Sequence, residues 1–395
     1  MYGTLAVLAA FAFVYSVVAS RLERTPVNGA LVFLAFGILA GPQVLGLLDP
    51  SVSGEGLRTV AELTLALVLF SDSANADLAT LRRTFRIPSR LLLIGLPLTI
   101  AFGFGVGTLL FPDLPLLTVA ILATMLAPTD AALGKAVVTN EAVPAPVREG
   151  LNVESGLNDG ICVPILFTFL ALAAGTEGST SEIVLHLFAE EIGIGLAVGI
   201  GLAVAGHRAI RTAYDRGWLE EPWAQLPVVA LAITSFGVAQ AAGGSGFIAC
   251  FVGGLTFGGL VKREKELLLA RAEGSGNLLS LLTWVMFGAA YVGQSLGDLD
   301  WRVLVYSLLS LTIVRMLPVS LSLLGLGVRA DAQLFLGWFG PRGLASIVFA
   351  VIVVGENVTG SGTLTTTVIC TVTLSILAHG LTANPFANAY SARAK

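Results

Sequence analysis

Residues 151–160 of the chain read LNVESGLNDG. This run places two carboxylates, two carboxamides and a hydroxyl within an otherwise apolar segment. A charged side chain near the centre of a bilayer costs about 3 kcal/mol or more, so it persists mainly where it has a partner, an ion or a proton to bind. The run is therefore the first candidate for a functional site.

The composition of the 395-residue chain is that of a membrane protein. Hydrophobic residues make up 55% and charged residues 12%, whereas soluble domains carry roughly 25% charged residues. Apolar runs of about 20 residues, the length that crosses the hydrocarbon core, recur from end to end. The alternation of apolar and polar residues that a transmembrane β-barrel needs is missing. We therefore expect an all-α membrane protein.

Thirteen apolar spans can be counted along the sequence. They cover about 2–20, 27–47, 57–75, 89–111, 115–138, 151–174, 183–206, 223–242, 246–261, 275–295, 303–326, 332–355 and 360–382. The first run is expected to be kept as a helix, because no basic segment precedes it as in a signal peptide. The connections are short, so no soluble domain is expected.

The distribution of basic residues predicts the orientation. With the N-terminus outside, 18 of the 22 basic residues fall on the cytoplasmic side. Arg58 and Arg302 fall outside, and Arg315 and Arg342 lie within spans. Loops rich in Lys and Arg stay in the cytoplasm. This predicts a multi-pass protein of the cell (inner) membrane, with its N-terminus outside and its C-terminus in the cytoplasm.

Two spans contain residues that interrupt a helix. The fifth reads MLAPTD at 125–130 and the twelfth GWFGPRG at 337–343. Proline removes a backbone donor and opens the helical hydrogen bonding. Spans seven apart cross the membrane in opposite directions, which predicts two six-helix inverted repeats with broken crossing helices 5 and 12. In transporters such pairs of broken helices form the binding site.

Helical spacing groups the polar side chains of residues 151–160. Glu154 and Asn158 are i and i+4, and Ser155 and Asp159 share the neighbouring stripe. Oxygen ligands suit alkali cations and protons, and the histidine or thiolate ligands of transition metals are missing. The sequence therefore predicts cation or proton binding here, with a purely structural Asp159 as the alternative.

The broken fifth span adds Thr129 and Asp130. The interruption exposes carbonyl and hydroxyl oxygens beside a carboxylate, which favours contact with the ion, directly or through water. The alternative is a helix N-cap, since both residue types satisfy free backbone N–H groups. The two roles are compatible.

Arg342 requires an anion, and Glu154 is the leading candidate for its partner. This pairing predicts a structural role for both residues, in which they orient Asn158. In the rival interpretation Glu154 binds the ion itself.

Other charged side chains are less decisive. Asp72 lies near the cytoplasmic end of the third span and either lines an access funnel or lies at the interface. Arg315 is expected to pair internally or face the cavity, and His379 to be structural. No nucleotide fingerprint or nucleophile arrangement is present, so neither an enzyme nor a nucleic-acid partner is expected.

Three motifs together resemble the monovalent cation/proton antiporter family of bacterial sodium/proton antiporters and animal sodium/hydrogen exchangers. They are PTD at 128–130, ESGLND at 154–159 and GPRG at 340–343. The resemblance implies the thirteen-helix antiporter fold, usually as a homodimer. It also implies transport-core helices at about 57–174 and 275–382 and dimerisation helices at about 1–47 and 183–261.

The resemblance also implies residue roles. Asp159 corresponds to the essential ion- and proton-binding aspartate, and the Asn158–Asp159 pair is similar to the electroneutral branch. The further ion contacts that it implies are Thr129, Asp130 and Ser155, and the supporting residues are Asn158, Glu154 and Arg342. Asp72 stands where many relatives have a glutamate, which leaves its role as a ligand open.

The expected function is exchange of Na⁺, and also Li⁺, for H⁺, one for one and by alternating access, in the service of pH homeostasis. No cofactor is expected beyond the transported ions. The alternatives are a K⁺/H⁺ antiporter and, more remotely, a sodium-coupled organic-anion symporter of similar fold or a channel.

Overall fold

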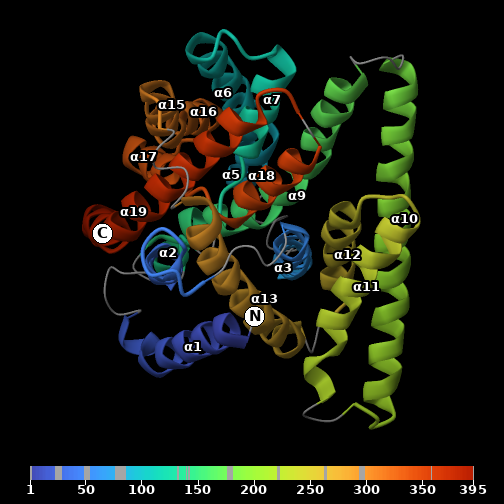
Figure 1. Cartoon of the computed structure of the whole chain (residues 1–395). Helices are drawn as coiled ribbons and strands as arrows, with labels where there is room; N and C mark the ends of the chain where they lie inside the picture. Colours follow the sequence, from blue (N-terminus) through green and yellow to red (C-terminus); the bar gives the residue numbers. More distant parts are fainter. Residues whose placement is uncertain are drawn as a thin grey trace. The chain divides into compact units, whose positions relative to one another are not determined.

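The computed structural model describes residues 2–22, 29–48, 54–75, 86–130, 133–138, 140, 143–175, 181–219, 223–261, 265–292, 299–356 and 358–394. Within these ranges all regular elements are helices (Figure 1). Seven helices are long and apolar enough to cross a membrane, and shorter apolar helices accompany them. The chain is therefore a multi-pass helical membrane protein. The count of thirteen spans and the inverted repeats stay predictions.

The helices are α1 (Tyr2–Leu22), α2 (Gly29–Ala40), α3 (Gly54–Asn75), α5 (Arg86–Arg90), η1 (Leu91–Gly95), α6 (Leu96–Leu110), α7 (Leu116–Met125), α8 (Lys135–Val138), α9 (Ala145–Gly175), α10 (Ser181–Asp215), η2 (Trp223–Gln225), α11 (Pro227–Ala241), α12 (Gly246–Leu260), α13 (Lys265–Phe287), η3 (Gly288–Val292), α15 (Trp301–Leu311), α16 (Ile313–Ser322), α17 (Ala330–Trp338), α18 (Leu344–Gly355) and α19 (Ser361–Ala394).

Several helices are longer than their predicted spans. Helices α9, α10 and α19 extend past the apolar stretches 151–174, 183–206 and 360–382. Hydropathy detects only the roughly 20 residues that match the thickness of the hydrocarbon core. The polar ends of these helices carry no such signal.

The contacts divide the chain into two units, each described here by itself. The first comprises Met1–Val60, Arg86–Ser155 and Leu281–Lys395, and the second Ala61–Phe85 and Gly156–Ser280. The predicted division into transport core and dimerisation helices concerns movement and stays a prediction. Part of the charge pattern behind the predicted orientation, including Arg24, Arg82, Arg83, Lys262 and Arg263, lies outside the described residues.

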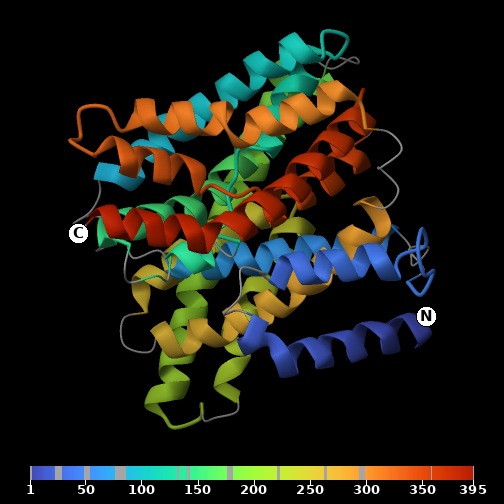
Figure 2. The ribbon, with the colours of Figure 1, turned by 90° about the vertical axis from the view of Figure 1, so that its left-hand side faces the viewer.

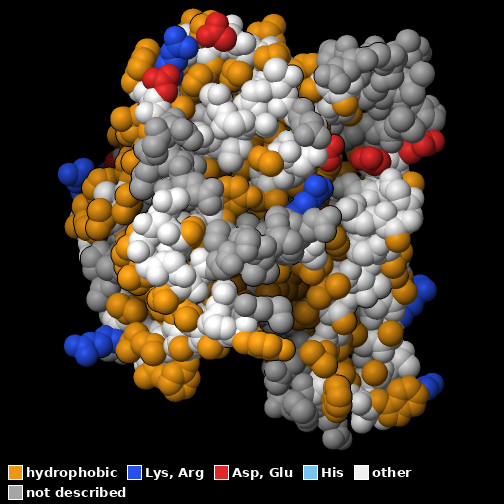
Figure 3. Space-filling view, in the orientation of Figure 1, with side chains coloured by type: hydrophobic (Ala, Val, Ile, Leu, Met, Phe, Trp, Pro, Cys, Tyr) orange, Lys and Arg blue, Asp and Glu red, His pale blue; other side chains and the backbone are white. Residues whose placement is uncertain are grey.

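In the first unit α19 packs against α15 and α18, and α6 packs against α7 and α16 (Figure 2). Many apolar side chains face outward. Leu93 and Leu109 are 71% and 81% exposed, and hydrophobic side chains are spread over the visible face in Figure 3. Lipid is as apolar as these side chains, so this exposure is expected for helices in a bilayer.

The predicted span 303–326 is interrupted, although its sequence does not predict an interruption. Helix α15 ends at Leu311 and α16 begins at Ile313, with Thr312 at φ −114° and ψ −96°. The Thr312 hydroxyl donates to the Leu308 carbonyl at 2.7 Å, a contact that bends helices. Pro318 follows inside α16. Arg315 therefore lies on α16, after the interruption, and does not continue the helix of α15.

In the second unit α10, α11 and α12 pack against one another (Figure 1). Glycines on α12 meet backbone directly. A Cβ on Gly254 would lie 3.0 Å from the carbonyl carbon of Phe70, and one on Gly258 2.7 Å from that of Ala74. Small residues let membrane helices approach closely, so glycine at these positions fixes the approach of α3 to α12.

Candidate functional site

The first interruption lies where the sequence predicts it. Helix α7 ends at Met125, and residues 126–130 are not helical. Pro128 lacks the backbone N–H that would continue the helix. The carbonyl groups at the end of α7 are therefore open to other donors.

The second interruption separates α17 from α18 at residues 339–343, and it meets the first. The Asp130 N–H donates to the Pro341 carbonyl at 2.8 Å. The Asp130 carboxylate accepts from the Leu344 N–H at 3.1 Å and from the Leu133 N–H at 3.3 Å. Asp130 thus caps the first turn of α18, the role that the sequence offers as an alternative to ion contact. Its contact with the ion stays a prediction.

Arg342 binds the backbone carbonyls that follow the end of α7. Its guanidinium is fully buried and donates through Nη1 to the carbonyls of Ala127 at 2.6 Å and Pro128 at 3.1 Å. Its backbone N–H donates to the Ser375 hydroxyl at 2.7 Å. A cation at a helix C-terminus compensates the helix dipole. Arg342 therefore supports the end of α7.

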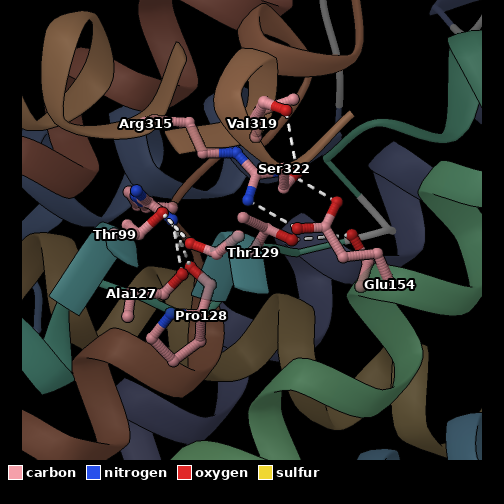
Figure 4. Close-up of polar contacts among 11 residues, drawn as sticks. Thr99, Ala127, Pro128, Thr129, Glu154, Arg315, Val319 and Ser322 are labelled. Atoms are coloured by element: carbon pink, nitrogen blue, oxygen red, sulfur yellow. Dashed lines mark hydrogen bonds and ion pairs between the residues drawn. The ribbon is translucent and has the colours of Figure 1, made fainter. Parts of the chain in front are cut away.

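The predicted pairing of Glu154 with Arg342 is wrong. Both oxygens of Glu154 accept from Arg315, at 2.5 Å from Nη1 and 2.7 Å from Nη2, and both side chains are buried. Figure 4 shows these two side chains pointing toward each other. One guanidinium thus engages both carboxylate oxygens of Glu154, and the supporting role of Glu154 stays a prediction.

Glycine in the second interruption makes room for this ion pair. A Cβ on Gly340 would lie 2.9 Å from Cζ of Arg315. The Arg315 guanidinium therefore lies directly against backbone. Arg315 and Arg342 are both single arginines within spans, so the sequence does not distinguish which of them pairs with Glu154.

A pair of buried hydroxyls joins the broken helix to α9. The Thr129 and Ser155 hydroxyl oxygens lie 2.9 Å apart, and the side chains are 1% and 5% exposed. The structure therefore brings these two predicted site residues together. Hydroxyl oxygens of this kind coordinate hard cations.

The second unit holds Asn158 and Asp159, on the same unbroken helix α9. They are 0% and 8% exposed. Asp159 is i+4 from Ser155, as the sequence predicts. The Asp72 backbone lies beside this part of α9, since a Cβ on Gly156 would be 3.6 Å from the Asp72 carbonyl oxygen.

Among the described residues no group of three or more His, Cys, Asp or Glu side chains is placed to hold a metal ion. The set of oxygen ligands for an alkali cation stays a prediction.

Gly343→Ala is expected to disrupt the crossing. A Cβ at residue 343 would lie 2.6 Å from Cγ of Asp130, so the carboxylate must leave the Leu344 N–H. We expect the free energy of unfolding to fall by about 1–3 kcal/mol, as for other overpacked sites. Thermal denaturation in detergent measures this. Gly201→Ala is the control, because a Cβ there meets nothing within 4 Å. Equal melting temperatures for the two variants would contradict the expectation.

Comparison with known proteins supports one family. The family described as "Sodium/hydrogen exchanger, transmembrane" matches residues 7–389. The K⁺/H⁺ antiporter NhaP2 of Shewanella sp. (strain ANA-3) is 27% identical over 88% of this chain and 59% of its own length. The probable Na⁺/H⁺ antiporter C3A11.09 of Schizosaccharomyces pombe is 23% identical over 85% of this chain and 46% of its own.

The chain thus spans about three fifths of the length of the first of these relatives. The fold is similar to that of the sodium proton antiporter MjNhaP1 from Methanocaldococcus jannaschii, with a TM-score of 0.79 and 20% identity over 95% of this chain and 98% of that one. A family match over nearly the whole sequence agrees with two broken helices that meet at Asp130 and Arg342. The chain belongs to the sodium/hydrogen exchanger family of membrane transporters.

Proposed function

We propose that this chain exchanges a monovalent cation for a proton by alternating access, with Asp159 binding either one. One observation carries the proposal. A carboxylate that is 8% exposed lies midway along the membrane-spanning helix α9. It is one turn from Ser155, whose hydroxyl contacts Thr129 of a broken helix at 2.9 Å.

Charge explains why binding and movement are coupled. An ionised carboxylate is costly in a low-dielectric barrier, whereas a carboxylate with a proton or a cation bound is neutral. Moving the site across the membrane barrier therefore costs less free energy with an ion bound than without one. Because a single carboxylate binds one ligand at a time, the two ions exchange and neither leaks alone.

The proposed one-for-one stoichiometry is supported by two features of the charges around Asp159. Glu154 and Arg315 neutralise each other in the first unit. The Asn158 side chain adds no second carboxylate beside Asp159. One proton exchanged for one monovalent cation moves no net charge, so we propose electroneutral exchange.

Sodium is the first candidate for the cation, with lithium as a second substrate. The family description and the names of two similar proteins support sodium. Potassium is the second candidate, since curated relatives at 26–27% identity are named K⁺/H⁺ antiporters.

The proposed assembly is a homodimer in the cell (inner) membrane with its N-terminus outside. The orientation rests on the excess of basic residues in the predicted cytoplasmic loops. The homodimer rests on the family resemblance. In the membrane such an exchanger would serve pH homeostasis.

Proteoliposomes that contain a pH-sensitive dye test the proposal. Adding external NaCl, LiCl, KCl or choline chloride in parallel should make the interior alkaline only with a transported cation. A response to Na⁺ and Li⁺ but not K⁺ supports the first candidate, and the reverse order supports the second. A response equal to that of choline would exclude exchange. A rate that changes with an imposed membrane potential would exclude one-for-one stoichiometry.

A further inference from the structure

His379 is a buried titratable side chain that the exchange mechanism does not use. It lies on α19 and is 1% exposed. Its Nδ1 is 2.8 Å from the Ser375 carbonyl oxygen, and its Nε2 is 2.8 Å from the Trp338 carbonyl oxygen. Each ring nitrogen therefore faces a carbonyl oxygen, which can only accept a hydrogen bond.

This geometry distinguishes the two protonation states of the ring. A neutral imidazole has one N–H and can donate to one of the two carbonyls, whereas an imidazolium donates to both. The neutral ring has a substitute arrangement. Its Nε2–H donates to Trp338, and its Nδ1 accepts from the Ser375 hydroxyl at 3.2 Å. Protonation at Nδ1 therefore adds a bond from Nδ1–H to the Ser375 carbonyl and breaks the bond that the Ser375 hydroxyl donates to Nδ1.

The contacts of His379 reach the end of α17 and the interruption that follows it. Trp338 is the last residue of α17, and its carbonyl also accepts from the Gly340 N–H at 2.8 Å. Within the interruption, the Arg342 N–H donates to the Ser375 hydroxyl at 2.7 Å. The imidazole and its serine partner thus tie α19 to the end of α17 and to the interruption itself.

Opposing influences act on the charge of the ring. Among the described residues the charged side chains that act on it are Arg342 in the interruption and Arg315 on α16, and both are cations. Burial also opposes a charge. Two carbonyl acceptors and the Trp338 ring, 5.2 Å away between centroids, favour the imidazolium. The bond from Nδ1 to the Ser375 carbonyl is available to the charged ring in addition to the bond to Trp338.

We propose that His379 is a second proton-binding residue, and that its protonation holds the interruption between α17 and α18 in the observed conformation. It is a positioning residue, because it acts through Trp338, Ser375 and Arg342. The inference rests on the proposed function in one respect: a crossing held in one conformation slows the exchange cycle. Acid pH therefore slows exchange through His379, separately from competition at Asp159.

Tryptophan fluorescence tests protonation without any transport assay. An imidazolium beside an indole quenches its emission, and the Trp338 indole is held in place by a bond from Nε1 to the Thr382 hydroxyl at 3.0 Å. Intact protein in detergent should show a pH-dependent step in emission. His379→Gln and Trp338→Phe should each remove this step. His207→Gln, a histidine change on α10, should keep it.

The pH profile of exchange tests the consequence. When one proton binds to His379, the unprotonated fraction of the ring falls up to about tenfold for each unit by which the pH decreases. The exchange rate of wild type should therefore fall by up to about tenfold per pH unit on the acid side. His379→Gln should lose distinctly less, while His207→Gln should follow wild type. His379→Asn serves the same comparison if the glutamine variant does not fold.

The outcomes separate the inference from the proposed function. Absence of exchange in wild type would overturn the proposed function, and the fluorescence step would still decide whether His379 binds a proton. A step that survives His379→Gln, or one that is missing from wild type, would overturn the inference. So would pH profiles of wild type and His379→Gln that coincide.

Discussion

Asp159→Asn is expected to reduce cation-driven proton exchange at least about 100-fold, to the level of liposomes without protein, which corresponds to roughly 3 kcal/mol or more. An amide has nearly the same size but binds neither a proton nor a cation as a carboxylate does. Dye-loaded proteoliposomes measure the effect.

The matched control is the same chemical change at the surface. The Asp215 side chain at the end of α10 is 67% exposed and lies 3.8 Å from Arg211. Asp215→Asn should leave the exchange rate unchanged. Asp159→Asn keeps the side-chain volume, and thermal denaturation in detergent decides whether the variant is as well folded as wild type. Full exchange by a well-folded Asp159→Asn variant would end the proposed mechanism.

The largest expected loss of stability follows from breaking the ion pair of Glu154 and Arg315. The two side chains are 0% and 1% exposed. Either Glu154→Gln or Arg315→Met leaves an unpaired buried charge, which costs about 3–5 kcal/mol. The double variant removes both charges and should recover most of the loss. Thermal denaturation of the two single variants and the double variant gives the coupling energy.

A surface pair provides the control for this cycle. Arg302 and Asp113 lie 3.6 Å apart with side chains 38% and 89% exposed. Exposed pairs contribute about 0–1 kcal/mol, so the variants Arg302→Met and Asp113→Asn should cost little singly or together. A small, additive effect at Glu154 and Arg315 would show that the buried pair does not hold α9 to α16.

The double variant also separates stability from function. If Glu154 and Arg315 orient the polar residues of α9, the variant that lacks both charges should be stable but slow in exchange. Recovery of both stability and exchange would show that this ion pair contributes only to folding.

The interrupted helices could be predicted from the sequence because their cause is local. Pro128 removes a donor, and the run from Gly340 to Gly343 places proline between glycines. Helical spacing likewise predicts the shared stripe of Ser155 and Asp159. The sequence predicts that the two broken helices cross. The structure adds that their interruptions are in contact, since the Asp130 N–H donates to the Pro341 carbonyl at 2.8 Å.

The partner of Glu154 could not be predicted, because it depends on which helix faces α9. Arg315 and Arg342 are both arginines within apolar spans, and no local rule separates them. The structure gives Arg342 backbone carbonyls and gives Arg315 the carboxylate. The interruption at Thr312 also lacks a strong signal, since neither proline nor glycine adjoins it.

The glycines of α12 determine how the second unit should respond to cold. The stabilisation that a soluble protein gains by burying apolar surface away from water weakens on cooling. In lipid this hydrophobic driving force does not act between helices. Where Gly254 and Gly258 bring α12 against the backbone of α3, cohesion comes from dispersion between closely packed atoms. Chilling should therefore loosen this seam less than it loosens the core of a water-soluble protein.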